Sequence, residues 1–87
     1  MTAVHKFLSS EITLPATANT VGGQKLVRLL NSGTDSHVIT QKDSGGNTVS
    51  TFTIRAGDIV VAEKATSDSF QVDTGTDVLA VPVAYRN

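Results

Sequence analysis

Two short motifs contain the residue types that hydrolytic enzymes use for catalysis. Asp35-Ser36-His37 holds the three letters of a hydrolase triad, but consecutive residues of one strand point to opposite faces, so these side chains cannot converge. Asp73-Thr74-Gly75 matches the motif of aspartic proteases, in which two carboxylates share a proton and activate water. Only twelve residues follow Gly75, whereas those proteases place a flap, a cleft wall and a helix after the motif. We therefore expect both motifs to be structural, with Asp73 and Gly75 shaping a β-turn.

Candidate metal ligands are few. His5 and His37 are the only histidines and the chain has no cysteine, so a zinc-type site would need both histidines and a carboxylate to meet. Oxygen ligands for calcium occur in two pairs, Asp43 with Asn47 and Asp73 with Asp77. Neither pair has the spacing of an EF-hand loop, so we expect exposed turns at both places. The sequence thus predicts no metal site, no cofactor and no catalytic residue.

Binding classes that need a distinctive surface are also disfavoured. Gly22-Gly23-Gln24-Lys25 lacks the spacing and the trailing Ser or Thr of a phosphate-binding loop. The formal net charge is −1, the seven basic residues are scattered, and the few aromatic residues form no stacking platform for bases. No apolar run approaches the ~18 residues that span a bilayer. We predict that the chain is not an enzyme and has neither a nucleic-acid nor a membrane partner.

The elements that carry these residues are predicted to be short β-strands. Val, Ile and Thr make up nearly a third of the chain, and their branched Cβ atoms favour a pleated strand over a helix. Gly, Asn, Asp, Ser and Pro interrupt the branched runs at short intervals. The pattern predicts one all-β domain over residues 1–87, a small antiparallel β-sandwich (jelly-roll or Ig-like) of about seven to eight short strands.

The predicted strands follow the branched runs. They cover residues 4–8, 11–14, 36–42, 48–55, 59–64, 69–72 and 78–85. Residues 25–30 fit two structures, because Leu26, Leu29 and Leu30 have the spacing of a helix face. We favour a strand there, since a run of this length is an ordinary strand and its neighbours on both sides are strand-like.

Three local features refine this prediction. The apolar residues of 48–55 change phase, which predicts a β-bulge near Ser50. Ile59-Val60-Val61 are three consecutive branched apolar residues, which predict a strand covered on both faces. Pro82 has no N–H to donate, so the last strand should lie at a sheet edge or bend at this residue.

Several runs of residues together resemble a family of phage proteins. They are AVHKFLSS at 3–10, ITLP at 12–15, LVRLLNSG at 26–33, TQKD at 40–43, IRAGD at 54–58 and EK at 63–64. Over nearly the whole chain they are similar to small virion structural proteins of tailed bacteriophages, especially cyanophages. The resemblance implies a β-sandwich that assembles on the particle as a capsid decoration (cement) protein and binds the major capsid protein or other virion subunits. It carries over no catalytic residue.

Two alternative functions stay open beside this one. Attachment at the neck or tail of the particle is closely related to it. A glycan-binding or host-surface-binding module belongs to another class, and it would expose aromatic side chains on loops.

The resemblance also implies a location and a set of contacts. The chain would be assembled into the virion in the host cytoplasm, as a homo-oligomer (possible as a trimer) or as copies bound to a lattice. Such assembly suits a small chain with a thin core, because burial against partners adds stability. We expect residues 2–8 and the final strand to contact neighbouring subunits. The candidate contact residues are Val4, Phe7, Leu8, Val83, Tyr85 and Arg86.

Overall fold

The computed structural model describes the backbone of residues 4–86 and the side chains of residues 6–84. The strands are β1 (Val4–Phe7), β2 (Ile12–Thr13), β3 (Leu26–Asn31), β4 (His37–Lys42), β5 (Thr48–Ile54), β6 (Ile59–Glu63), β7 (Ser69–Val72) and β8 (Val78–Arg86). These bounds lie within a few residues of the predicted strands, and the predicted all-β class is confirmed. In the part of the chain that is described, no helix is long and apolar enough to cross a membrane.

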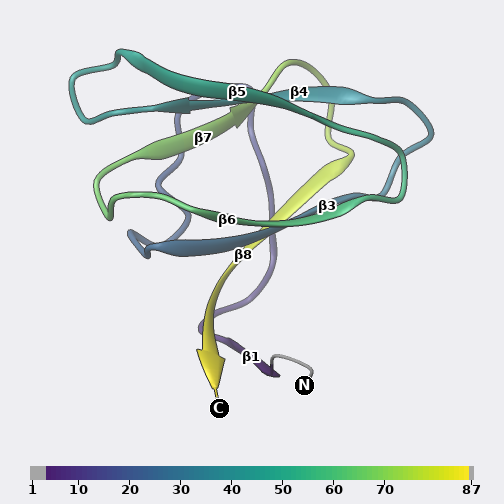
Figure 1. The fold of residues 1–87 in the computed structure, drawn as a ribbon. Coiled ribbons are helices and arrows are strands. Elements are labelled where there is room, and N and C mark those ends of the chain that lie inside the picture. Colours follow the sequence, from purple (N-terminus) through teal and green to yellow (C-terminus); the bar gives the residue numbers. More distant parts are fainter. Residues whose placement is uncertain (1–3, 87) are drawn as a thin grey trace.

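The strands form two antiparallel sheets that lie one above the other (Figure 1). The five-stranded sheet has the order β1-β8-β3-β6, with β2 also paired to β8. The three-stranded sheet has the order β5-β4-β7. The predicted antiparallel β-sandwich is therefore the architecture of this protein.

The strand order is that of a jelly roll, in which a long hairpin is wrapped into two sheets. Strands 1 and 8, 3 and 6, and 4 and 5 are paired, as this wrapping requires. A jelly roll also pairs its second and seventh strands. Here the segment that follows β2 takes this place beside β7. There the Val72 N–H donates to the Pro15 oxygen at 3.1 Å, and Asn19 forms a β-bridge with Phe70.

The hydrophobic core lies between the two sheets. Alternate residues of β3 point into it, so Val27, Leu29 and Asn31 are buried while their neighbours are half-buried. This alternation confirms a strand at residues 25–30, with Leu29 inside and Leu26 and Leu30 on the other face. Among the described side chains, Phe70 is the largest that is fully buried, and its ring meets Phe52 edge to face at a centroid distance of 6.3 Å. Each fully buried side chain of this size stabilises the fold by about 1.5–3 kcal/mol.

The predicted bulge in β5 is confirmed. Gln41 of β4 lies opposite Ser50, but the next residue, Lys42, lies opposite Thr48. Val49 is therefore the extra residue between two ladder pairs, which explains the change of phase in the sequence.

Pro82 was predicted to place the last strand at a sheet edge or to bend it, and the first of these two placements, the sheet edge, is wrong. β8 lies between β3 on one side and β1 and β2 on the other. The Pro82 oxygen accepts a hydrogen bond from the Leu8 N–H at 3.0 Å, beyond the end of β1. Since the nitrogen and the oxygen of a strand residue point to the same side, the missing N–H faces the gap between β1 and β2, and the ladder to β3 is intact.

The prediction that residues 59–61 are covered on both faces is also wrong. β6 is the end strand of its sheet, and Ile59 is 55% exposed. Val60 packs against the core, but the side chains of Ile59 and Val61 lie on the opposite face of the sheet. A run of branched residues indicates a strand, but it does not reveal whether a second layer covers the outer face.

Candidate functional site

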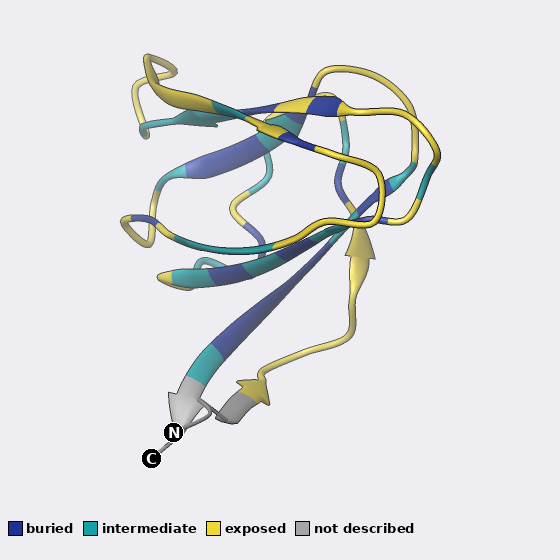
Figure 2. Ribbon diagram, turned by 45° about the vertical axis from the view of Figure 1, so that its right-hand side comes forward, coloured by how far each residue is buried: buried dark blue, intermediate teal, exposed yellow. Residues whose placement is uncertain are grey.

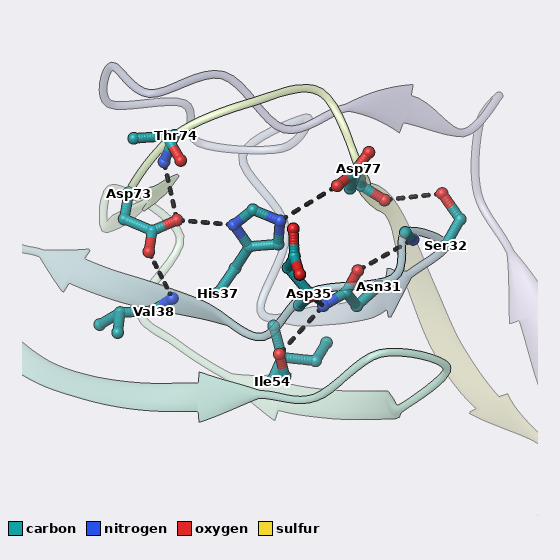
Figure 3. A network of polar contacts seen from close by, with 10 residues as sticks. Asn31, Ser32, Asp35, His37, Val38, Ile54, Asp73, Thr74 and Asp77 are labelled. Atoms are coloured by element: carbon teal, nitrogen blue, oxygen red, sulfur yellow. Dashed lines mark hydrogen bonds and ion pairs between the residues drawn. The ribbon is translucent and has the colours of Figure 1, made fainter.

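Within the described part of the chain, His37 lies in a network of polar contacts with two carboxylates (Figure 3). His37 begins β4, Asp73 follows β7, and Asp77 precedes β8. His37 Nδ1 lies 2.8 Å from Asp73 Oδ1, and His37 Nε2 lies 3.2 Å from Asp77 Oδ2. The imidazole is therefore held between two carboxylates from the two ends of one turn.

The electrostatics favour a charged imidazole in this position. The hydrogen bond that the imidazole donates to Asp73, followed by the one to Asp77, raises the pKa of His37 above its ordinary value. The hydrogen bond from His37 is the main cause that lowers the pKa of Asp73, and backbone N–H donors at Val38 and Thr74 add to it. The His37 side chain is only 8% exposed, but the side chains of Asp73 and Asp77 are 41% and 43% exposed, so water partly screens these contacts.

A buried asparagine connects this group to the neighbouring strands. The Asn31 side-chain NH₂ group donates to the backbone carbonyl oxygens of Asp35 (2.7 Å) and Ile54 (3.0 Å). Its Oδ1 accepts a hydrogen bond from the Gly33 N–H at 3.0 Å. Beside it, the Ser32 N–H and the Ser32 hydroxyl both donate to the backbone carbonyl oxygen of Asp77. The turn before β8 is therefore held through the backbone of Asp77 as well as through its carboxylate.

This arrangement is suited to holding structure together and not to catalysis. Both ring nitrogens of His37 are occupied by carboxylates, so neither is free to act as a general base or a metal ligand. Among the described residues, no group of three or more His, Cys, Asp and Glu side chains could hold a metal ion. We interpret the cluster as a clamp that fixes the turn at residues 73–77 to the start of β4.

The two protease-like motifs of the sequence meet in this clamp. Asp73 and Gly75 form the expected turn, with the Thr74 N–H donating to Asp73 Oδ1 and Gly75 at a φ of 82°. Sequence reasoning missed that Asp73 would reach His37, because the contact depends on β7 pairing with β4 across about thirty intervening residues. The other candidate calcium pair also forms a turn, in which Asp43 Oδ1 accepts N–H groups of Gly45 and Asn47.

The outer faces of the two sheets differ in character. Strand register places these side chains on the outer face of the five-stranded sheet: Phe7, Thr13, Leu26, Arg28, Leu30, Ile59, Val61, Glu63, Leu79, Val81 and Val83. Most of them are apolar; of the apolar ones, Phe7 and Ile59 are exposed, Leu26, Leu30, Val61 and Leu79 are half-buried, and Val81 and Val83 are buried. The outer face of the three-stranded sheet instead carries Val38, Thr40, Lys42, Thr51, Thr53 and Gln71. An antiparallel sheet that faces water is usually polar on that side, so the face of the five-stranded sheet is the unusual one.

Of the predicted contact residues, Phe7 and Val83 lie on this outer face, and Leu8 directly follows β1. Phe7 is 57% exposed and Leu8 is 39% exposed, whereas Val83 is 2% exposed and packed within the chain itself. Val4, Tyr85 and Arg86 belong to paired strands, but their side chains lie outside the described residues. β1 and the end of β8 run side by side away from the two-layer body, and the segment after β1 is exposed along its length (Figure 2).

A small hollow lies on the same face, beside Phe7. Its volume is about 220 Å³, and its walls are Phe7, Ser9, Glu11, Arg28 and Val81. Arg28 lies 3.3 Å from Glu11 and 5.9 Å from the centroid of the Phe7 ring. Sites for drug-sized ligands and cofactors usually have about 300–1,000 Å³, whereas about 150 Å³ is enough for one benzene ring. The hollow therefore fits a single aromatic or aliphatic side chain better than a substrate.

Comparisons of the chain with models of known protein families, with curated protein sequences and with solved structures found no match.

Proposed function

We propose that this chain is a structural protein of the virion of a tailed bacteriophage. In this proposal it is a capsid decoration protein that binds and stabilises the major capsid lattice. The outer face of the five-stranded sheet lies against the shell, and the threonine-rich face of the three-stranded sheet points to solvent.

The contrast between the two outer faces is the observation that carries this proposal. Leu26, Leu30, Leu79 and Val61 are half-buried on this face, at positions where an independent sandwich would place polar side chains. Burial of such a face against a partner contributes roughly 25 cal/mol for each Å² of apolar surface removed from water. A chain of 87 residues has a thin core, so this additional burial matters for its stability.

The hollow beside Phe7 gives the face a specific anchoring point. A partner side chain seated there would contact the Phe7 ring and Val81, with Arg28 and Glu11 at the polar margin. Interfaces of this kind draw most of their binding energy from a few side chains that fill pockets, surrounded by polar contacts that exclude water.

The fold supports the proposal only in a general way. Jelly rolls occur in viral capsid proteins, but also in lectins and in enzymes of the cupin type, and one fold can host many functions. The choice among them rests on the residue runs that resemble phage virion proteins and on the apolar outer face. A glycan-binding module would need exposed aromatic side chains on loops, but Phe7, the aromatic residue at the hollow, lies on a strand.

Copy number in purified virions tests the proposal directly. Quantitative mass spectrometry should find this chain in the particle in numbers comparable with those of the major capsid protein. A small, fixed number of copies would instead support the neck or tail alternative. Absence of the chain from washed particles would contradict a structural role of either kind.

A further inference from the structure

The five-stranded sheet ends at β6, and the free edge of this strand has a defined hydrogen-bonding pattern. The Lys64 N–H donates to the Lys25 oxygen at 2.7 Å, and the Asn31 N–H donates to the Asp58 oxygen at 3.0 Å. Hydrogen-bonded pairs alternate along an antiparallel ladder, so these two bonds identify which β6 residues face β3. The residues between them that point their N–H and C=O groups away from the sheet are Ile59, Val61 and Glu63.

Three other strands, β1, β5 and β7, carry known edge-protecting devices, whereas β6 carries only one, the exposed charge of Glu63 at its end. The edge of β7 is covered by the segment after β2, through bonds at Pro15 and Asn19. The edge strand β5 contains the bulge at Val49, and β1 is only four residues long and carries an exposed Lys6. β6 has no proline and no bulge, and its Ile59 is exposed. Such an edge is a template for pairing with another strand.

We propose that β6 pairs with β6 of a second copy of this chain, antiparallel and around a two-fold axis at Val61. This register places Val61 opposite Val61 of the other copy, and Ile59 opposite Glu63 of the other copy. All three outward-pointing residues then exchange N–H···O=C bonds with the partner strand. The two five-stranded sheets become one continuous sheet, and their apolar outer faces become one surface.

A second copy of the chain fits this edge because the charged residue of β6, Glu63, does not oppose itself in the pairing. In the two-fold register, the carboxylate of Glu63 faces an isoleucine and not another carboxylate. Like charges directly opposite each other would destabilise the pair. The short strand makes the contact modest in solution, and copies held close together on a surface would strengthen it through their high local concentration. The inference concerns the free chain and does not depend on the virion proposal.

Charge variants at Ile59 test both the contact and its register. Sedimentation velocity of the purified chain over a range of concentrations should show a monomer–dimer equilibrium. Ile59→Glu places a carboxylate opposite Glu63 of the other copy at both ends of the strand pair, so dimerisation should weaken by about tenfold or more. Ile59→Lys changes the same exposed side chain but faces Glu63 with a cation, and should keep the dimer.

Three outcomes of this experiment would overturn the proposal. They are a wild-type chain that stays monomeric at all concentrations, an equal loss of dimer in both variants, and an unchanged dimer in Ile59→Glu. The melting temperature of each variant shows that it is folded.

A proline pair tests the backbone bonds separately. Val61→Pro removes an N–H that points away from β3, so it should abolish dimerisation while leaving the fold intact. Thr53→Pro is the matched control on the free edge of β5. Val38, which lies opposite Thr53, accepts the Asp73 N–H on the side of β4 that faces β7, so the Thr53 N–H points away from β4. The control should dimerise normally, and an equal effect of both prolines would contradict the assignment to β6.

Discussion

His37 and Asp73, which are 36 residues apart in the sequence, contact each other through Nδ1 and Oδ1 at 2.8 Å. This contact joins the start of β4 to the end of β7, and Asp77 closes the other side of the imidazole. The clamp fixes the turn that leads into β8, the strand at the centre of the apolar outer face.

The clamp predicts a pH dependence of stability. The pKa of His37 is raised above 6.5, so its contribution is complete below that pH and is lost as pH rises through the folded-state pKa. The pKa of Asp73 is lowered below 3.8, so its contribution is present above that value and is lost as pH falls through the lowered pKa. Urea unfolding from about pH 5 to about pH 9 should show a free energy of unfolding that declines toward the alkaline end.

Variants of the two partners identify the source of this decline. His37→Gln removes the titrating group, and Asp73→Asn removes the main cause of its raised pKa. Both variants should therefore flatten the dependence of the free energy of unfolding on pH. NMR titration of the His37 imidazole gives the folded-state pKa directly. A value at or below 6.5, or a decline that persists in His37→Gln, would show that the clamp is not responsible.

Gly33 is predicted to be required for the contact between Asp77 and His37. A Cβ built on Gly33 would overlap the side chain of Asp77. Gly33→Ala should therefore displace this carboxylate, lower the pKa of His37 toward its ordinary value, and reduce stability by about 1–3 kcal/mol. Gly46→Ala is a useful comparison, because a Cβ there meets no atom within 4 Å although its φ of 84° adds backbone strain. It should leave the titration of His37 unchanged, and an equal change in both variants would count against a steric origin.

Asn31 is predicted to be the most sensitive polar residue of the core. It is fully buried, and its amide satisfies two carbonyl oxygens and one N–H. Asn31→Ala removes all three of these hydrogen bonds from the buried core, which should cost about 2–4 kcal/mol. Asn47→Ala, in an exposed turn, should cost less than about 1 kcal/mol. Urea unfolding of both variants checks the difference, and similar losses would show that the Asn31 bonds contribute little.

Much of the fold could be predicted from the sequence because strand formation is a local property. The branched runs and the Gly and Asp clusters between them gave strand positions to within a few residues, including the bulge beside Ser50. The pairing of strands is not local. The proximity of His37 and Asp73, the free edge of β6 and the place of Pro82 inside a sheet all depend on the strand order, which the residue pattern does not encode.

The candidate contact surface was predicted only at its terminal end. Phe7 and Leu8 were expected at subunit contacts because they lie near the start of the chain, and both are exposed. The larger apolar face depends on which alternate residues of β3, β6 and β8 point outward together. That coincidence requires the register of three strands, so the sequence alone gave no signal for it.

Occupancy of virions by two matched variants tests most directly that the outer face of the five-stranded sheet binds the shell. Phe7→Glu places a charge at the hollow on that face, and Val38→Glu places the same charge on the opposite face, at a side chain that is 40% exposed. Quantitative mass spectrometry of particles made with each variant should show that Phe7→Glu is largely lost while Val38→Glu is retained at the wild-type level. Equal occupancy of the two variants, or selective loss of Val38→Glu, would contradict the proposed orientation.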